Sequence, residues 1–195
     1  MIGLDTNVLA RYSVRDESDA EADQGLDPAG SAAAEYLRQH DQALRWAAAN
    51  RALIAHRVMT ALNASGECRL DIGHNEVQPL DGQGERLWLH RKGAAPADRG
   101  PVVIPGSRGT LSYLVQPCAN SDHSLRSLAH GAGRKWKRGE ARSRLSHRQR
   151  PEDLMTTALG GWVICEDKEL LYDEAPENYK GIDQVVADLR EAGLI

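Results

Sequence analysis

At residues 128–138 the chain has the sequence Leu-Ala-His-Gly-Ala-Gly-Arg-Lys-Trp-Lys-Arg, and this stretch decides how the rest is interpreted. Small residues let the backbone approach an anionic ligand closely, and the Arg and Lys side chains that follow can neutralise it. A neutral imidazole is abundant near pH 7 and can form a covalent intermediate. The stretch therefore predicts a phosphate-binding turn with His130 as a candidate nucleophile. A turn histidine beside a solvated basic segment is the alternative interpretation.

Further blocks of the same kind lie on both sides of this stretch. They are Gly-His-Asn at 73–75, His-Arg-Lys-Gly-Ala at 90–94, Ile-Pro-Gly-Ser-Arg-Gly at 104–109 with Ser-Tyr at 112–113, Asp-Glu-Ala-Pro at 173–176, and Tyr-Lys at 179–180 with Ile-Asp at 182–183. In order and spacing they resemble the motifs of the RtcB family of RNA ligases, over roughly residues 30–195. Ser-Leu-Ala before the histidine, Arg108, and Val-Ile-Cys-Glu-Asp at 163–167 are most similar to the branch linked to release factor H.

The resemblance implies a role for each matching residue. It makes His130 the catalytic residue, which takes GMP from GTP. It places Lys92, Arg134 and Arg138 at phosphates of GTP or RNA, where a guanidinium suits bidentate contact. The nucleotide-binding positions would be Asn75, Pro105, Gly106, Ser107, Arg108, Ser112, Gly131, Ala132, Gly133 and Tyr179. Among these, Tyr179 matches a tyrosine that packs on the guanine ring.

The metal site is the least complete part of the resemblance. Family members use two Mn²⁺ ions, held by an Asp-x-x-Cys segment and several histidines, and only His74 has a counterpart here. One imidazole does not make a manganese site, because divalent affinity needs several converging ligands. The sequence therefore looks like the C-terminal portion of such a ligase without its metal-binding front half. A polypeptide that supplies the N-terminal half is an expected partner.

The resemblance implies GTP-dependent joining of RNA 3′-phosphate or 2′,3′-cyclic phosphate ends to 5′-hydroxyl ends. Two alternatives from other classes stay open. The chain is a non-catalytic remnant or RNA-binding module, which the missing metal segment favours for the isolated chain. Or it is a PIN-type ribonuclease, because residues 1–12 are similar to the opening of PIN-domain nucleases, where an aspartate such as Asp5 is a metal ligand.

Composition sets the broad class. The chain has 195 residues, of which 41% are hydrophobic, and a net charge of −4, although residues 126–150 carry nine Arg and Lys side chains against the single acid Glu140. That basic block could follow an RNA backbone, or be a solvated loop. Three separated cysteines suggest a reducing compartment. Because no apolar run approaches the roughly 20 residues that span a bilayer, we expect a soluble, cytoplasmic protein without membrane contact.

Periodicity predicts an α+β fold, with a mixed sheet and flanking helices. Residues 1–28 are unlike the family and are expected to be foreign to the ligase-like part, 29–195, with 14–30 as a linker. An apolar stripe predicts a helix over 31–62, with His40 and His56 on its surface. A second stripe predicts a helix from Ile182 that ends at Gly193. Strands are expected at 87–90, 102–104, 111–115 and 162–165.

Overall fold

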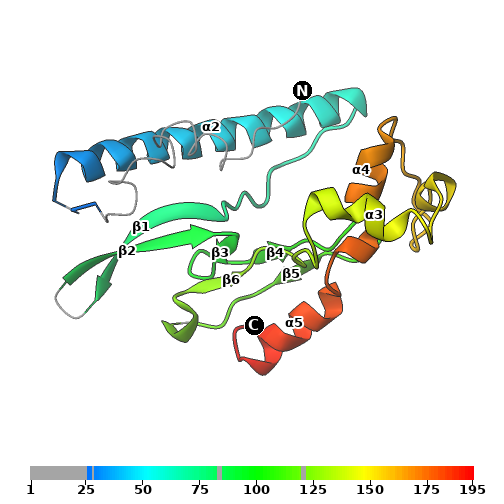
Figure 1. Cartoon of the computed structure of the whole chain (residues 1–195). Helices are drawn as coiled ribbons and strands as arrows, with labels where there is room; N and C mark the ends of the chain where they lie inside the picture. Colours follow the sequence, from blue (N-terminus) through cyan, green and yellow to red (C-terminus); the bar gives the residue numbers. More distant parts are fainter. Residues whose placement is uncertain (1–25, 28, 83–84, 120–121) are drawn as a thin grey trace, which may run out of the picture. The chain divides into compact units, whose positions relative to one another are not determined.

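The computed structural model of this protein describes residues 26–27, 29–82, 85–119 and 122–195 (Figure 1). Residues 1–12 with Asp5, on which the PIN-type alternative depends, lie outside these residues. The chain divides into two compact units, Met1–Lys92 and Gly93–Ile195, and each is described by itself.

The described part of the first unit contains the long helix α2 (Ser31–Ala61), which confirms the predicted helix. Alanine-rich sequence favours it, and Arg38 and Gln39 both donate to the Glu35 carboxylate at 2.7 Å. These hydrogen bonds lower the pKa of Glu35 to about 2. The helix ends because Asn63 adopts a left-handed φ of 49°, which directs the Ala64 N–H to the Met59 carbonyl at 2.9 Å.

Strands β1 (Asn75–Gly82) and β2 (Glu85–Lys92) complete the first unit as an antiparallel pair. Their register sets Asn75 opposite Lys92 and Glu76 opposite Arg91. Side chains alternate along β2, so Leu89 and Arg91 are buried while His90 and Lys92 are exposed. The expected strand at 87–90 is thus confirmed as the middle of β2.

The second unit contains two more antiparallel pairs, β3 (Ala94–Pro96) with β6 (Ser127–Ala129) and β4 (Val102–Ile104) with β5 (Tyr113–Val115). Val102, Ile104 and Leu128 are buried in it. The α+β class is confirmed. Instead of one mixed sheet, the described strands form three two-stranded sheets, because each strand has a single partner.

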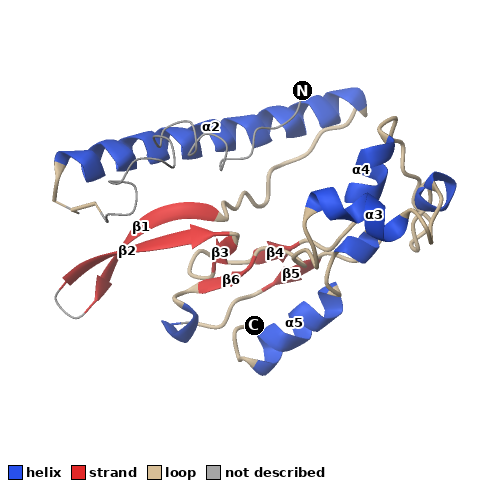
Figure 2. Ribbon diagram, viewed as in Figure 1, coloured by secondary structure: helices blue, strands red, loops and turns tan. Residues whose placement is uncertain are grey.

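Helix α4 (Lys168–Asp173) packs beside α3 (Ala141–Leu145) (Figure 2). It also packs beside the short helix η3 (Pro151–Leu154). Between them lies the apolar cluster of the second unit, formed by Leu145, Leu154, Leu171, Tyr172 and Ala175. The remaining short helices are η1 (Asp122–Ser124), η2 (Arg138–Glu140) and η4 (Pro176–Asn178).

The last helix, α5 (Ile182–Glu191), is confirmed together with its predicted end. Gly193 has a φ of +66°, and the Leu194 N–H bonds to the Leu189 carbonyl at 2.9 Å. Glycine adopts this conformation without steric cost, so the helix stops where the sequence places it. No helix in the described part of the chain is long and apolar enough to cross a bilayer.

Two expectations are wrong. Residues 162–165 form no strand, because Trp162 makes only an isolated bridge to Thr156. His40 is not a surface residue, since its side chain is 13% exposed and its Nε2 accepts a hydrogen bond from the Val77 N–H at 2.9 Å. His56 is exposed as predicted. The apolar stripe of α2 is mostly not buried, for Ile54, Val58 and Leu62 are 49%, 51% and 70% exposed.

Candidate functional site

His130 is the first residue after strand β6 and its side chain is exposed. Because Ala94 pairs with Ala129 in antiparallel register, the next residues along the two strands, Gly93 and His130, face each other. A Cβ placed on Gly93 would lie 2.9 Å from Nε2 of His130. The candidate nucleophile therefore lies directly beside a residue that has no side chain.

The Gly-Ala-Gly run after His130 contacts the loop that joins β4 to β5. The Ala132 N–H donates to the Pro105 carbonyl at 3.1 Å, and Ala132 itself is buried. Within that loop, Ser112 Oγ accepts from the Gly106 N–H at 3.3 Å. A Cβ on Gly106 would meet the Leu111 carbonyl oxygen at 2.3 Å, so only glycine fits this close approach.

Ser107 and Arg108 take part in the internal structure of the same loop. The Ser107 carbonyl accepts from the Thr110 hydroxyl at 2.9 Å. Arg108 donates from Nη2 to the Leu171 carbonyl in α4 at 2.8 Å, which ties the loop to the helical cluster. Arg108 thus has a structural contact, and its expected nucleotide contact stays a prediction.

The segment after Gly133 forms a short backbone ladder with the turn around Tyr179. Lys135 N–H donates to the Asn178 carbonyl at 2.7 Å, and Lys180 N–H donates to the Gly133 carbonyl at 3.0 Å. Asn178 is fully buried and its amide bonds the Tyr172 and Asp173 carbonyls at 2.6 and 2.9 Å. Its Oδ1 accepts from the Trp136 indole N–H at 2.7 Å. Asn178 therefore holds the two segments together.

Arg134 and Tyr179 are in direct contact. The Arg134 guanidinium lies 5.0 Å from the Tyr179 ring centroid, and it donates to the Tyr179 hydroxyl at 3.0 Å and the Asp173 carbonyl at 2.7 Å. The Tyr179 hydroxyl donates to the Glu174 carboxylate. Burial, followed by the Glu174 carboxylate, raises the pKa of Tyr179, so its hydroxyl stays protonated at neutral pH. Arg134 fixes Tyr179 in place, and its expected phosphate contact stays a prediction.

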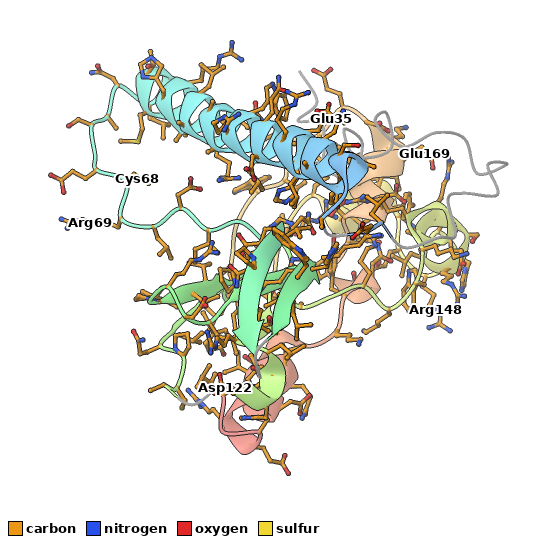
Figure 3. All side chains as sticks on the ribbon, turned by 90° about the vertical axis from the view of Figure 1, so that its left-hand side faces the viewer. Glu35, Cys68, Arg69, Asp122, Arg148 and Glu169 are labelled. Carbon is orange, nitrogen blue, oxygen red and sulfur yellow. The ribbon has the colours of Figure 1, made fainter. Side chains whose placement is uncertain are left out.

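The basic segment 134–150 is partly neutralised by its own Glu140 and by acids from elsewhere in the second unit. Arg138 pairs with Glu174 at 3.3 Å, Arg144 pairs with Glu140 at 2.8 Å, and Arg142 pairs with Glu169 of α4. Among the described residues, the exposed side chains of Lys137, Arg148 and Arg150 form no ion pair with a carboxylate. Arg148 lies on the outside of the segment that follows α3 (Figure 3). This segment presents a surplus of positive charge to solvent.

The first unit holds the other expected site residues at the open end of its hairpin. His74 directly precedes β1 and is exposed, while Asn75 pairs with Lys92 across the two strands. The next pair along is a buried ion pair, in which Arg91 Nη1 donates to Glu76 Oε1 at 2.7 Å. His74, Asn75 and Lys92 are thus neighbours at this end of the hairpin.

The family model of the tRNA-splicing ligase RtcB matches residues 14–195 of the chain. The chain belongs to the RtcB family. It is 45% identical over 193 residues to RNA-splicing ligase RtcB2 of Escherichia coli (strain ATCC 25922), covering 99% of this chain and 49% of that protein. It is 34% identical to tRNA-splicing ligase RtcB of Nanoarchaeum equitans, over 82% of this chain and 39% of that protein. It is 32% identical to RNA-splicing ligase RtcB of Escherichia coli K12, over 78% of this chain and 40% of that protein.

The chain therefore spans about half the length, or less, of these RtcB relatives. The family model begins to match at residue 14, within the segment 1–28 that is expected to be foreign to the ligase-like part. The boundary at residue 28 stays a prediction.

The residues present do not fit a manganese centre by themselves. Within the described ranges, no group of three or more His, Cys, Asp or Glu side chains could hold a metal ion. A divalent first-row ion needs several converging ligands, and His74 offers one imidazole. No chemical step is assigned to a metal on this chain.

Sequence reasoning identified the segments that meet but missed three residues that organise them. Gly93 belongs to a block that was recognised, yet its place opposite His130 depends on the pairing of two three-residue strands. Asn178 and Glu174 act through partners distant in sequence, such as Trp136 and Arg134. Glu174 belongs to the block at 173–176 and Asn178 directly precedes Tyr179, but the sequence carries no signal for their partners.

Proposed function

We propose that this chain is the nucleotide-binding part of a GTP-dependent RNA ligase that joins 3′-phosphate or 2′,3′-cyclic phosphate ends to 5′-hydroxyl ends. One observation supports it most. Three segments far apart in sequence are hydrogen-bonded around His130, through Ala132 to Pro105, Gly133 to Lys180, and Lys135 to Asn178. This brings a nucleophile, a glycine-rich turn and an aromatic ring into one unit.

The proposed reaction begins at His130. An unprotonated ring nitrogen attacks the α-phosphorus of GTP, the bond to pyrophosphate breaks, and a guanylyl-histidine forms. The GMP group then passes to the RNA 3′-phosphate, which converts that end into one with a good leaving group. The 5′-hydroxyl attacks this activated end and GMP leaves. Exposure of His130 is consistent with access by both GTP and RNA.

The surrounding residues fit nucleotide and phosphate contacts. Backbone groups of the small residues Gly131, Ala132 and Gly133 can approach the guanylyl phosphate. The loop that carries Ser107 and Ser112 offers two hydroxyls to ribose or phosphate oxygens. The remaining assignments are Tyr179 on the guanine ring, Arg108 and Asn75 on the nucleotide, and Lys92, Arg134 and Arg138 on phosphates of GTP or RNA.

Manganese ligands beyond His74 would come from polypeptide outside this chain. The relatives are about twice as long or longer, which leaves room for such a segment. We expect the chain alone to bind Mn²⁺ weakly or not at all. Calorimetry that showed tight stoichiometric binding would contradict this, and Asp5, His90 and His123 would then be candidate ligands.

A second candidate function is RNA binding without turnover, which the surplus positive charge of residues 134–150 favours. Phosphate contacts need only exposed cations such as Lys137, Arg148 and Arg150, and they weaken steeply with added salt. A ligase also needs transition-state stabilisation, and loss of one stabilising group typically costs about 100- to 1,000-fold in rate. The chain by itself would then retain RNA but not join it.

One experiment separates these functions. The chain is incubated with GTP, Mn²⁺ and an RNA pair bearing 3′-phosphate and 5′-hydroxyl ends. The incubation is done with and without the first half of RNA-splicing ligase RtcB2 of Escherichia coli. We expect joined RNA only with the added half, and none with His130→Ala. RNA retained in both cases but never joined would favour the binding module. Joining by the chain alone that is lost in His130→Ala would show that the missing half is dispensable.

A further inference from the structure

The backbone of Gly93 lies against the ring of His130. An added Cβ at Gly93 would lie 2.9 Å from Nε2, 3.1 Å from Cδ2 and 3.9 Å from Cε1 of the His130 ring. Real Cβ atoms essentially never come within 3.0 Å of such an atom. The ring therefore lies across the backbone of Gly93 with its Nε2–Cδ2 edge in the space that a side chain would fill.

The strand pairing explains this contact. Side chains of directly opposed residues in an antiparallel pair point to the same face, and aromatic rings fold over an opposed glycine. Ala94 pairs with Ala129, which sets Gly93 against His130 one position further along. The β3–β6 pair thus positions the imidazole, and its precision depends on the residue at 93.

We propose that Gly93 is a positioning residue for His130: its missing side chain lets Nε2 lie where a phosphorus atom can reach it. The inference rests on the proposed function only in taking His130 as the nucleophile. A methyl group at position 93 would push the ring away from its place beside the Gly131–Gly133 turn. A displacement of about 1 Å from an attack geometry can cost on the order of 100-fold in rate.

Backbone strain and side-chain contact must be separated, because Gly93 also has a φ of +69°. Alanine is strained at any such position. Gly100 provides the matched control: it lies in the same unit, its φ is +96°, and an added Cβ there would meet nothing within 4 Å. Gly93→Ala and Gly100→Ala therefore share the strain, and only the first touches His130.

The test uses the full chain and potassium phosphoramidate, a small phosphoryl donor that needs neither GTP nor metal. The lone pair of a histidine nitrogen attacks phosphorus, the P–N bond of the donor breaks, and ammonia leaves. ³¹P NMR distinguishes Nε2 from Nδ1 products, and peptide mapping under alkaline conditions assigns the residue. The exposed His56 on α2 is the internal standard within each sample.

We expect His130 in the unaltered chain to be phosphorylated mainly at Nε2. Relative to His56, this product should fall by about tenfold or more in Gly93→Ala, and change by less than about twofold in Gly100→Ala. An unfolded Gly93→Ala chain has the opposite signature, because its His130 would react like His56 at both nitrogens. Circular dichroism and thermal unfolding of both variants check this independently.

Three results would overturn the inference. They are an unchanged Nε2 product in Gly93→Ala, an equal loss in Gly100→Ala, or reaction of the unaltered chain mainly at Nδ1. Failure of the proposed function looks different: the Gly93 dependence with phosphoramidate would persist, while no GMP adduct formed on His130 when the missing half is supplied.

Discussion

The two units of the chain bury their side chains in different ways. In the first unit, α2 buries only Ala33, and the buried groups of the hairpin include the ion pair Glu76–Arg91. The second unit encloses an apolar cluster around Leu171 and Tyr172 and a fully buried amide, Asn178. The candidate nucleophile His130 belongs to the unit with the apolar cluster.

This difference shows what the expected site residues of each unit depend on. Apolar burial is non-directional and stabilises a whole cluster, so the loops around His130 rest on packing that many residues share. A buried ion pair depends on geometry, and removal of one partner leaves an uncompensated charge. The positions of His74, Asn75 and Lys92 should therefore depend on the neighbouring Glu76–Arg91 pair. Helix α2 should tolerate substitutions at its exposed apolar positions.

The largest effect is expected for Glu76→Ala, which leaves the Arg91 guanidinium buried without this carboxylate. Breaking such a pair costs about 3–5 kcal/mol of unfolding free energy. Urea denaturation measures it, with Glu67→Ala as control, because the Glu67–Arg69 pair is exposed and should contribute almost nothing. Equal losses in the two variants would mean that the Glu76 pair is solvated.

A slightly smaller loss is expected for Leu171→Ala, since Leu171 is 2% exposed within the apolar cluster. Large-to-small changes of this kind cost about 2–5 kcal/mol. The neighbouring Leu170, which is 48% exposed on the same helix, is the matched control, and Leu170→Ala should stay within about 0.5 kcal/mol of the unaltered chain. If the two variants denatured alike, α4 would not be the packed element described here.

A pH-dependent effect should distinguish the second unit further. The raised pKa of Tyr179 means that the folded state holds this proton more tightly than the unfolded state does. The stability that this difference contributes to the folded state is fully present below the ordinary tyrosine pKa of about 10, and it is lost as pH rises above that value. Above about pH 10, Tyr179→Phe should therefore lose less stability with rising pH than the unaltered chain does. Parallel pH profiles would contradict both the burial of the Tyr179 hydroxyl and its contact with Glu174.

The smallest effect is expected in α2. Ile54 is 49% exposed, and alanine is the better helix former, so Ile54→Ala should leave the free energy of unfolding within about 0.5 kcal/mol. Thermal unfolding by circular dichroism suffices as the measurement. A loss as large as that of Leu171→Ala would show that the two units do not differ in packing, and would remove the basis of the comparison.

Features with local causes could be predicted from the sequence. The helix from Ser31 and the helix from Ile182 to its end at Gly193 follow from periodicity and capping residues. Strand Val102–Ile104 follows from a short β-branched run. The strand expected at 162–165 did not form because the apolar run has no partner strand.

Features that depend on distant partners could not be predicted. The pairing of β3 with β6 joins residues more than thirty positions apart, and it sets Gly93 opposite His130. His40 Nε2 accepts a hydrogen bond from the backbone N–H of Val77. Arg134 donates to the Tyr179 hydroxyl and to the Asp173 carbonyl. Motif resemblance identified Arg134 as a site residue and did not concern His40, and the partners of both side chains follow only from the folded chain.

The most direct test of the central claim is a labelled adduct. The chain is supplied with the first half of RNA-splicing ligase RtcB2 of Escherichia coli, Mn²⁺ and GTP labelled at the α-phosphate. Peptides are then mapped under conditions that preserve the phosphorus–nitrogen bond. We expect an acid-labile GMP adduct on His130 and none in His130→Ala, since no neighbouring side chain replaces the attacking nitrogen. An adduct of equal yield on the His130→Ala chain would contradict the assignment of His130 as the nucleophile.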